Sequence, residues 1–151
     1  MGLQSIRYAL AAFTLAAAPA SAEPGPAALS ANHLAIHVQD LETSARFYTG
    51  VLGLQRMPTQ PSPTIIWLET GGFELHLIGG RTQPVQTPRE VHLAFRVSDL
   101  QPITARLDTN RVDWGNFAGE AQTISKRVDG VSQIYLRDPD GYWIELNQLG
   151  R

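Results

Sequence analysis

Apolar and polar residues alternate along two stretches of this chain that are nearly the same. The first reads HLAIHVQDL over residues 33–41 and the second reads HLAFRVSDL over residues 92–100, with six of nine positions identical. Side chains in a strand point alternately to opposite faces, so each stretch predicts a strand with one apolar face and one face that carries histidine. The offset of 59 residues indicates an internal repeat.

The residues after each stretch predict the same order of elements. An aspartate cap and apolar positions at helical spacing predict a helix over residues 41–52, closed by Gly53, and a second helix of about ten residues after Asp99. Alternation and turn residues then predict strands at 54–57, 64–69, 73–78, 112–115, 131–137 and 142–147. Residues 116–126 fit no single element. The expected fold class is α+β, with two tandem βαβββ modules (residues 32–78 and 91–147) in one domain, residues 32–149.

The composition narrows the function classes. The chain has 151 residues, which is enough for one domain with a hydrophobic core, and 43% of them are hydrophobic. A formal net charge of −2 at pH 7 gives no basic surface for nucleic acid, so the expected partner is a small-molecule substrate. Because cysteine is absent, carboxylates and imidazoles are the groups that would carry any chemistry.

The first 22 residues are typical of a cleavable signal peptide. Arg7 precedes an apolar run over residues 8–18, and the sequence Ala-Ser-Ala at residues 20–22 matches a small-residue cleavage site. The run is shorter than the roughly 20 residues that span a membrane, and no cysteine follows it for a lipid anchor. We therefore expect a mature chain from Glu23, a linker over residues 23–31, and a periplasmic or secreted protein without a membrane anchor.

Four residues at matching places in the two modules form a candidate metal site. They are two histidines that begin the first strands and two glutamates within FELHL and YWIEL, namely His33, His92, Glu74 and Glu145. Each is expected on the strand face opposite the apolar residues. Taken singly, each would be a hydrogen-bonded histidine or a solvated glutamate. Together, two nitrogen and two oxygen ligands suit Ni²⁺, Co²⁺, Zn²⁺, Mn²⁺ or Fe²⁺. We expect the two sheets to curl so that these faces enclose one cavity around the ion.

The same strand faces supply the expected lining of a substrate pocket. His37 and His76 each lie two residues from a candidate ligand, on the same face, and are expected to line the pocket and not to hold the ion. Arg96, Trp143 and Asn147 complete this predicted lining from the second module.

The phrases HLAIHVQDL, FYTGVLGL and DPDGYWIEL resemble the vicinal oxygen chelate superfamily, which includes glyoxalase I, fosfomycin-resistance transferases, bleomycin-resistance proteins, methylmalonyl-CoA epimerases and extradiol dioxygenases. The resemblance covers residues 32–148 and implies paired βαβββ modules. It implies that His33, His92 and Glu145 bind a metal, and the glyoxalase I branch adds a glutamate at the place of Glu74. It also implies a homodimer, in which sites are often built across chains.

The chain departs from the glyoxalase I pattern at two places. That pattern has an arginine four residues after the first histidine and an asparagine four residues after the fourth-strand glutamate, and both bind glutathione. Here the two places hold His37 and Ile78. The resemblance therefore implies the metal chemistry without glutathione recognition, unless Arg96, at the place equivalent to His37, replaces one anchor.

We therefore expect a metal-dependent, glyoxalase-like lyase or isomerase that acts on a substrate with two adjacent oxygens. The metal would polarise a carbonyl while a glutamate moves a proton, and the resemblance implies Glu145 as the base, with Glu74 second. Two other functions stay open. One is an Fe²⁺ dioxygenase on His33, His92 and Glu145. The other is a non-catalytic module that sequesters a ligand or drug between aromatic walls from Trp67, Tyr135 and Trp143.

Overall fold

Residues 30–148 are described by the structure, which is a computed structural model. The predicted signal peptide (residues 1–22) lies outside the described residues, as does the linker up to residue 29. Among the residues that the structure describes, no helix is both long and apolar enough to cross a membrane.

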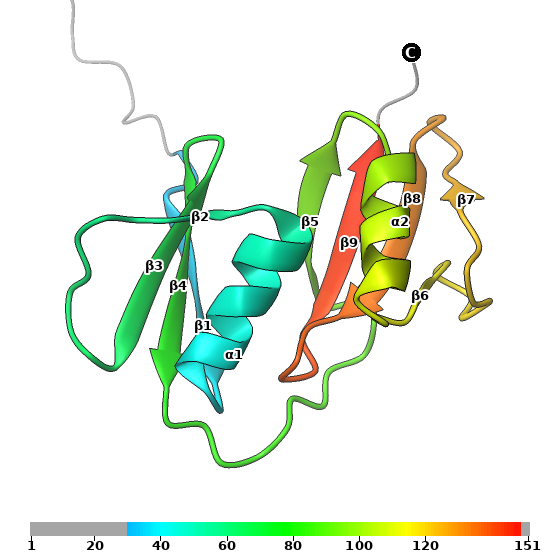
Figure 1. Ribbon diagram of the computed structural model, residues 1–151. Helices are drawn as coiled ribbons and strands as arrows, with labels where there is room; N and C mark the ends of the chain where they lie inside the picture. The colour runs from blue at the N-terminus through cyan, green and yellow to red at the C-terminus, as the bar shows by residue number, and fades with distance from the viewer. Residues whose placement is uncertain (1–29, 149–151) are drawn as a thin grey trace, which may run out of the picture. The chain divides into compact units, whose positions relative to one another are not determined.

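The first module has the predicted order of elements. It contains β1 (His33–Val38), α1 (Leu41–Arg46), the π-helix η1 (Phe47–Leu52), β2 (Gln55–Arg56), β3 (Ile65–Thr70) and β4 (Phe73–Gly79). The strands form one sheet in the order β1-β4-β3-β2 (Figure 1), in which β1 runs parallel to β4 and the β3–β4 hairpin is antiparallel. The Gly71-Gly72 turn has positive φ at both residues, which glycine adopts without steric cost.

The second module repeats this topology. It contains β5 (His92–Val97), α2 (Gln101–Thr109), β6 (Trp114–Gly115), β7 (Ser125–Lys126), β8 (Ser132–Arg137) and β9 (Trp143–Gln148). Its sheet has the order β5-β9-β8-β6, with β5 parallel to β9 (Figure 1). The mixed α+β fold and the βαβββ repeat are therefore confirmed. The short strand β7, which pairs with β8, lies at the end of the segment that the pattern left unassigned.

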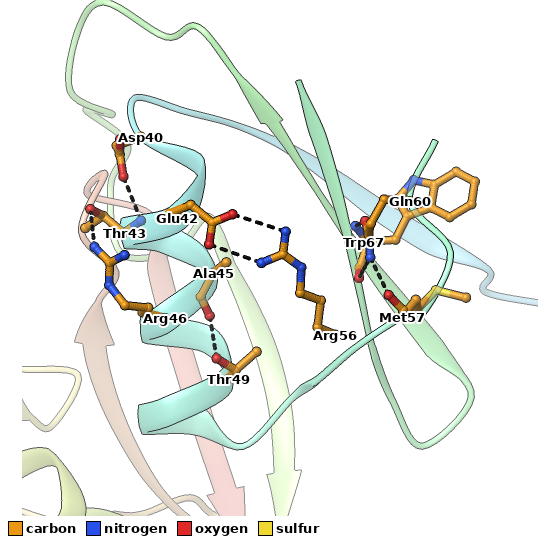
Figure 2. A network of polar contacts seen from close by, with 10 residues as sticks. All are labelled: Asp40, Glu42, Thr43, Ala45, Arg46, Thr49, Arg56, Met57, Gln60 and Trp67. Carbon is orange, nitrogen blue, oxygen red and sulfur yellow. Dashed lines mark hydrogen bonds and ion pairs between the residues drawn. The ribbon is translucent and has the colours of Figure 1, made fainter. Parts of the chain in front are cut away.

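The first helix begins as predicted and continues differently. Asp40 accepts a hydrogen bond from the Thr43 amide at 2.7 Å, as an N-cap does, and Glu42 forms an exposed ion pair with Arg56 of β2 (Figure 2). The predicted single helix over residues 41–52 is an α-helix that turns into a π-helix at Phe47. Gly53 ends it in the left-handed conformation, with φ of 87°.

The second helix starts one residue later than a cap at Asp99 would give. Leu100 occupies the N-cap position, Pro102 lies in the first turn, and Asp99 accepts a hydrogen bond from the Gln101 amide at 2.9 Å. Proline fits the first turn because its missing N–H is not needed there.

Apolar residues of both modules form one buried cluster. It includes Ile36, Val38, Tyr48, Leu68, Leu75 and Leu77 from the first module and Leu100, Leu107, Ile134, Leu136, Ile144 and Leu146 from the second. Full burial of one such side chain stabilises the fold by about 1.5–3 kcal/mol. The predicted apolar face of β1 is confirmed at Ile36 and Val38, whereas Leu34 is 37% exposed.

The turn between β8 and β9 joins the modules through buried carboxylates. Asp140 accepts hydrogen bonds from the Gln39 amide at 2.6 Å and the Ser44 hydroxyl at 2.7 Å. Asp138 accepts one from the Tyr48 hydroxyl at 2.8 Å. Both aspartates are buried, so these bonds fix the first helix against the second module where water does not compete.

This packing changes one expectation about the cavity. The buried cluster lies between the two sheets, and the histidines of β1 and β5 lie in separate sheets, each on the face away from the core. The histidine-bearing faces of one chain therefore do not enclose a common cavity. The reason is that the apolar faces of both sheets pack with the helices into one core, which leaves the histidine-bearing faces outside it.

Candidate functional site

The four predicted ligands form two histidine–glutamate pairs, one in each sheet. His33 of β1 is the register partner of Glu74 of β4. His92 of β5 lies beside Glu145 of β9, with 2.9 Å between Nε2 and Oε2. Among residues 30–148, no group of three or more histidine, aspartate or glutamate side chains lies close enough to hold one metal ion. One chain thus brings each pair together and keeps the two pairs apart.

The first pair lies on an open sheet face and is held by aromatic and polar contacts. His33 is exposed, and its Nδ1 lies 2.7 Å from Asn32 Oδ1. Glu74 Oε2 accepts a hydrogen bond from His76 Nε2 at 2.8 Å. The His76 ring stacks on the His33 ring, with centroids 4.3 Å apart. The predicted pocket residue His76 is therefore in contact with both candidate ligands.

In the second pair Glu145 is buried and more heavily hydrogen-bonded, while His92 is partly exposed. The Glu145 residue is only 4% exposed. Its Oε2 accepts a hydrogen bond from the Tyr135 hydroxyl at 2.9 Å, and its Oε1 accepts one from Asn147 Nδ2 at 3.1 Å. Arg127 Nη1 lies 3.8 Å from Oε1. These donors give partners to both oxygens of a carboxylate that burial removes from water.

Two residues beside Glu145, namely Tyr135 and Arg127, are not among the predicted site residues. Tyr135 was expected only as an aromatic wall, yet its hydroxyl bonds Glu145, and burial raises the pKa of Tyr135 to about 12. It therefore remains a hydrogen-bond donor at neutral pH. The signal for it was present, because the predicted turn at residues 138–141 sets the register that pairs Tyr135 with Glu145. Arg127 lies in the segment before β8, and no pattern pointed to it.

The hydrogen bonds of both histidines fit a divalent metal. The Nδ1 atom of His92 lies 2.8 Å from the Arg89 carbonyl oxygen, which can only accept, so Nδ1 carries the hydrogen. The Nε2 atom faces Glu145 Oε2 at 2.9 Å, and since two acceptors do not bond each other, a proton or a metal ion has to lie between them. The Nδ1 atom of His33 bonds Asn32 in the same way. Metal-binding histidines commonly donate their other ring nitrogen to a carbonyl or carboxylate, which fixes the ring and raises its basicity.

The remaining predicted pocket residues lie on the same two faces. His37 is exposed and its Nε2 bonds the Gly79 carbonyl at 3.1 Å. Arg96 is exposed and is the register partner of Asn147, which bonds Glu145. Trp143 donates its Nε1 hydrogen to the Thr87 carbonyl, and the guanidinium groups of Arg89 and Arg137 lie 4.4 and 4.2 Å from its ring centroid.

A hollow of about 900 Å³ lies along the edge of the second sheet. Its lining includes Arg89, Trp114, Tyr135, Arg137 and Trp143. His92 and Glu145 are not part of this lining, so the hollow borders the second pair and does not contain it. It has the aromatic and cationic groups to receive part of a small molecule held next to Glu145.

Comparison with known proteins identifies the family. Residues 30–146 match the Glyoxalase/Bleomycin resistance protein/Dioxygenase superfamily. The chain belongs to this superfamily. It is 30% identical over 126 residues to a probable lactoylglutathione lyase of Vibrio parahaemolyticus, covering 77% of this chain and 88% of that protein. It is also 30% identical over 123 residues to the glutathione transferase FosA of Serratia marcescens, covering 78% of this chain and 79% of the transferase.

Solved structures agree with this assignment. The structure of the oxidase ChaP-H2 superposes with a TM-score of 0.67 at 27% identity, covering 81% of this chain and 94% of the oxidase. A lyase, a transferase and an oxidase thus share this superfamily fold, so the fold alone does not select the reaction. The predicted membership of this superfamily is confirmed.

Proposed function

We propose that this protein is a divalent-metal-dependent enzyme that transfers a proton on a small substrate bound through two adjacent oxygens. The observation that carries the proposal is that each module brings a first-strand histidine and a last-strand glutamate onto one sheet face, each with its histidine Nδ1 already hydrogen-bonded. The glutamates do not lie at the matching places that the repeat predicted, because Glu74 is the register partner of His33 whereas Glu145 is that of Ala94. The residues that would hold the ion are His33, Glu74, His92 and Glu145. When bound, the ion would polarise a substrate carbonyl and lower the cost of negative charge on its oxygen.

We further propose that the complete site forms between two copies of the chain. Each sheet carries two of the four ligands on its outer face, His33 with Glu74 on the first and His92 with Glu145 on the second. The core lies between the two sheets of one chain. In a twofold dimer, a face that contacts a second face is contacted by it in return. The first-module face of one copy on the second-module face of the other would therefore create two identical four-ligand sites.

The two glutamates are suited to different roles. Glu145 is buried and has hydrogen-bond donors at both oxygens, which favours the role of a fixed ligand. The Glu74 side chain is 34% exposed, and only its Oε2 has a hydrogen-bond partner among the described residues. We therefore propose Glu74 as the group that takes the proton, which reverses the order implied by the family resemblance.

Metal analysis and isotope exchange test the reaction class. Elemental analysis of the full chain, purified without chelators, should give one divalent ion per chain. Incubation of this protein with small 2-oxoaldehydes and hydroxyketones in D₂O should place deuterium on the carbon next to the carbonyl, as seen by NMR. Chelator treatment and Glu74→Gln should each abolish the exchange. A metal-free preparation, or exchange that persists after chelation, would overturn the proposal.

Complementation tests the site between copies. A His33→Ala chain and a His92→Ala chain, produced together with different tags and purified as the mixed dimer, should regain one intact site of two. Each variant alone should bind no metal. Since exchange in twofold dimers is statistical, an unsorted mixture should regain about a quarter of the sites. A mixed dimer without metal, or a monomer by sedimentation that binds metal, would contradict this arrangement.

A second function has one observation in its favour. The oxidase ChaP-H2 resembles this chain over most of its length, and a trio of two histidines and one carboxylate suits Fe²⁺ in oxygen chemistry. Oxygen uptake with catechols distinguishes the two functions, because proton transfer consumes no oxygen. Uptake that depends on His33, His92 and Glu145 but not on Glu74 would favour the dioxygenase.

A further inference from the structure

His76 is the centre of a stack of three aromatic rings on the outer face of the first sheet. Its ring lies 4.3 Å from the His33 ring at an interplanar angle of 14°, and 5.0 Å from the Trp67 ring at 27°. The three residues come from three neighbouring strands, β1, β4 and β3, and Trp67 is the register partner of His76. The neighbouring residues Leu75 and Leu77 point the other way and are fully buried. His76 therefore does not belong to the core.

The same ring is hydrogen-bonded to the candidate ligand Glu74. The distance from His76 Nε2 to Glu74 Oε2 is 2.8 Å, and the two side chains are 15% and 34% exposed. An ionised carboxylate only accepts, so His76 Nε2 donates its hydrogen. This bond occupies one oxygen of Glu74 and leaves Oε1 without a partner among residues 30–148. His76 thus selects which oxygen of Glu74 is free.

The outer end of the stack is itself held in place. The backbone amide of Trp67 donates to Gln60 Oε1 at 2.7 Å (Figure 2). The Trp67 carbonyl accepts from the Met57 amide at 3.0 Å. Gln60 Nε2 also donates to the Trp67 carbonyl at 3.3 Å. The loop before β3 therefore fixes the strand from which Trp67 projects, and Trp67 restricts the His76 ring from the side opposite His33.

We propose that His76 is a positioning residue that orients two metal ligands at once, Glu74 by a hydrogen bond and His33 by stacking. This inference rests on the proposed metal site and assigns His76 no place among the ligands. A carboxylate and an imidazole on an open strand would otherwise each sample several rotamers, and fixing them before the metal binds reduces the entropic cost of binding. Groups of this kind, which contact ligands but not the ion, typically change metal affinity by about 10–100-fold.

His37 is a matched control for this role. It lies on the same face, two residues from His33, and its ring bonds the Gly79 carbonyl instead of either ligand. Replacement of His37 removes an imidazole from the same strand face without touching the hydrogen bond to Glu74 or the stack on His33.

The test measures the affinity of the full chain for Ni²⁺ and Zn²⁺ by competition with a chelator. His76→Ala should weaken metal binding by about 10–100-fold while stoichiometry at saturating metal stays at one ion per chain. His76→Gln, which keeps a donor for Glu74, and His76→Phe, which keeps the stack, should each regain part of the loss. His37→Ala should bind metal as the unaltered chain does.

The outcomes separate this inference from the proposed site. Equal affinity of His76→Ala and the unaltered chain, with binding still lost in His33→Ala, would overturn the positioning role alone. Loss of all metal in His76→Ala at saturation would also overturn it, because His76 would then be a ligand. Unchanged metal binding in His33→Ala would instead overturn the proposed site. A thermal unfolding curve of each variant shows whether it is folded, and His76→Gln replaces His76→Ala if the alanine variant is not.

Discussion

Tyr48 donates its hydroxyl hydrogen to Asp138 Oδ2 at 2.8 Å, across 90 residues of sequence. Tyr48 lies in the π-helix of the first module, and Asp138 begins the turn between β8 and β9 of the second. Both are buried, with Tyr48 fully so. Burial raises the pKa of the Asp138 carboxyl above its ordinary value, and the bond from Tyr48 opposes that rise. The bond therefore stabilises an ionised carboxylate at the contact between the modules.

Tyr48→Phe should destabilise the fold by about 1.5–3 kcal/mol at pH 7, the usual worth of a hydrogen bond to a charged group. Because the folded-state pKa of Asp138 is raised, its contribution to stability is full below the ordinary pKa of about 3.8 and is lost as the pH rises through the raised value. The variant raises this pKa further. The difference in unfolding free energy between Tyr48→Phe and the unaltered chain should thus be largest at pH 7 and shrink toward pH 4. Urea unfolding at each pH measures it.

Two variants control for this prediction. Tyr142→Phe also removes a hydroxyl between the modules, but among residues 30–148 that hydroxyl bonds only the backbone of His37 and no charged group. Its cost should be smaller, about 0.5–1.5 kcal/mol, and independent of pH. In an Asp138→Asn background, Tyr48→Phe should cost less than in the unaltered chain. An equal cost in both backgrounds would mean that the charge of Asp138 is not what the hydroxyl stabilises.

The ligand set gives a second prediction. His33→Ala, His92→Ala and Glu145→Ala should each abolish stoichiometric metal in the purified protein, because each removes a direct ligand and weakens binding more than the loss of a positioning residue does. Elemental analysis of the purified variants measures this. His76→Ala should retain stoichiometric metal at saturation. His37→Ala should bind as much metal as the unaltered chain does at every metal concentration. Full metal content in all three ligand variants would mean that these residues form hydrogen bonds in their sheets and do not bind the metal.

The order of elements could be predicted from the sequence because it depends on local patterns. Alternation along residues 33–38 and 92–97, the cap at Asp40 and the Gly71-Gly72 turn each act within a few residues. Because both halves have the same pattern, the sequence predicts the same topology for both modules. The π-helical second half of the first helix and the two-residue strand β7 could not be predicted, because α-helical spacing does not distinguish a π-helix and two residues are too few to show alternation.

The candidate site was predictable in part for the same reason. Strand alternation placed His33 with Glu74, and His92 with Glu145, on the faces away from the core. Alternation carries no information about how two sheets pack, so the separation of the two pairs within a chain did not follow from it. That packing is set by buried carboxylates in a turn, and turn residues are usually read as solvent-exposed.

Export gives a third prediction. Residues 1–22 have the pattern of a cleavable signal peptide, so intact-mass analysis of the protein recovered from the periplasm or the medium should give a chain that starts at Glu23. Replacement of Ala20 and Ala22 by bulky residues should block cleavage, because the peptidase site accepts small side chains. Full-length protein in the soluble cytoplasmic fraction would contradict export.

The last prediction concerns glutathione. The hemithioacetal of methylglyoxal and glutathione should be a poor substrate with Ni²⁺, Co²⁺ or Zn²⁺. Glutathione carries two carboxylates, and the two places that bind them in glyoxalase I hold His37 and Ile78 here. An arginine presents a planar fork of donors with a charge that does not depend on working pH. A histidine has a shorter side chain without this fork of donors, and isoleucine offers no donor. Loss of one charge-assisted contact costs about 1.5–3 kcal/mol, so two losses weaken binding roughly a hundredfold to ten-thousandfold.

One residue could reverse this outcome. Arg96 is exposed on the second-module face, at the place equivalent to His37, and no ion pair engages it among the described residues. In a dimer of the proposed kind it would face the first-module face of the other copy, where His37 and Ile78 lie. Robust turnover of the hemithioacetal that Arg96→Ala abolishes, with metal content unchanged, would mean that this arginine replaces the missing anchor. Weak turnover that Arg96→Ala leaves unaltered, together with exchange on smaller carbonyl compounds, would instead place the substrate among molecules without the two glutathione carboxylates.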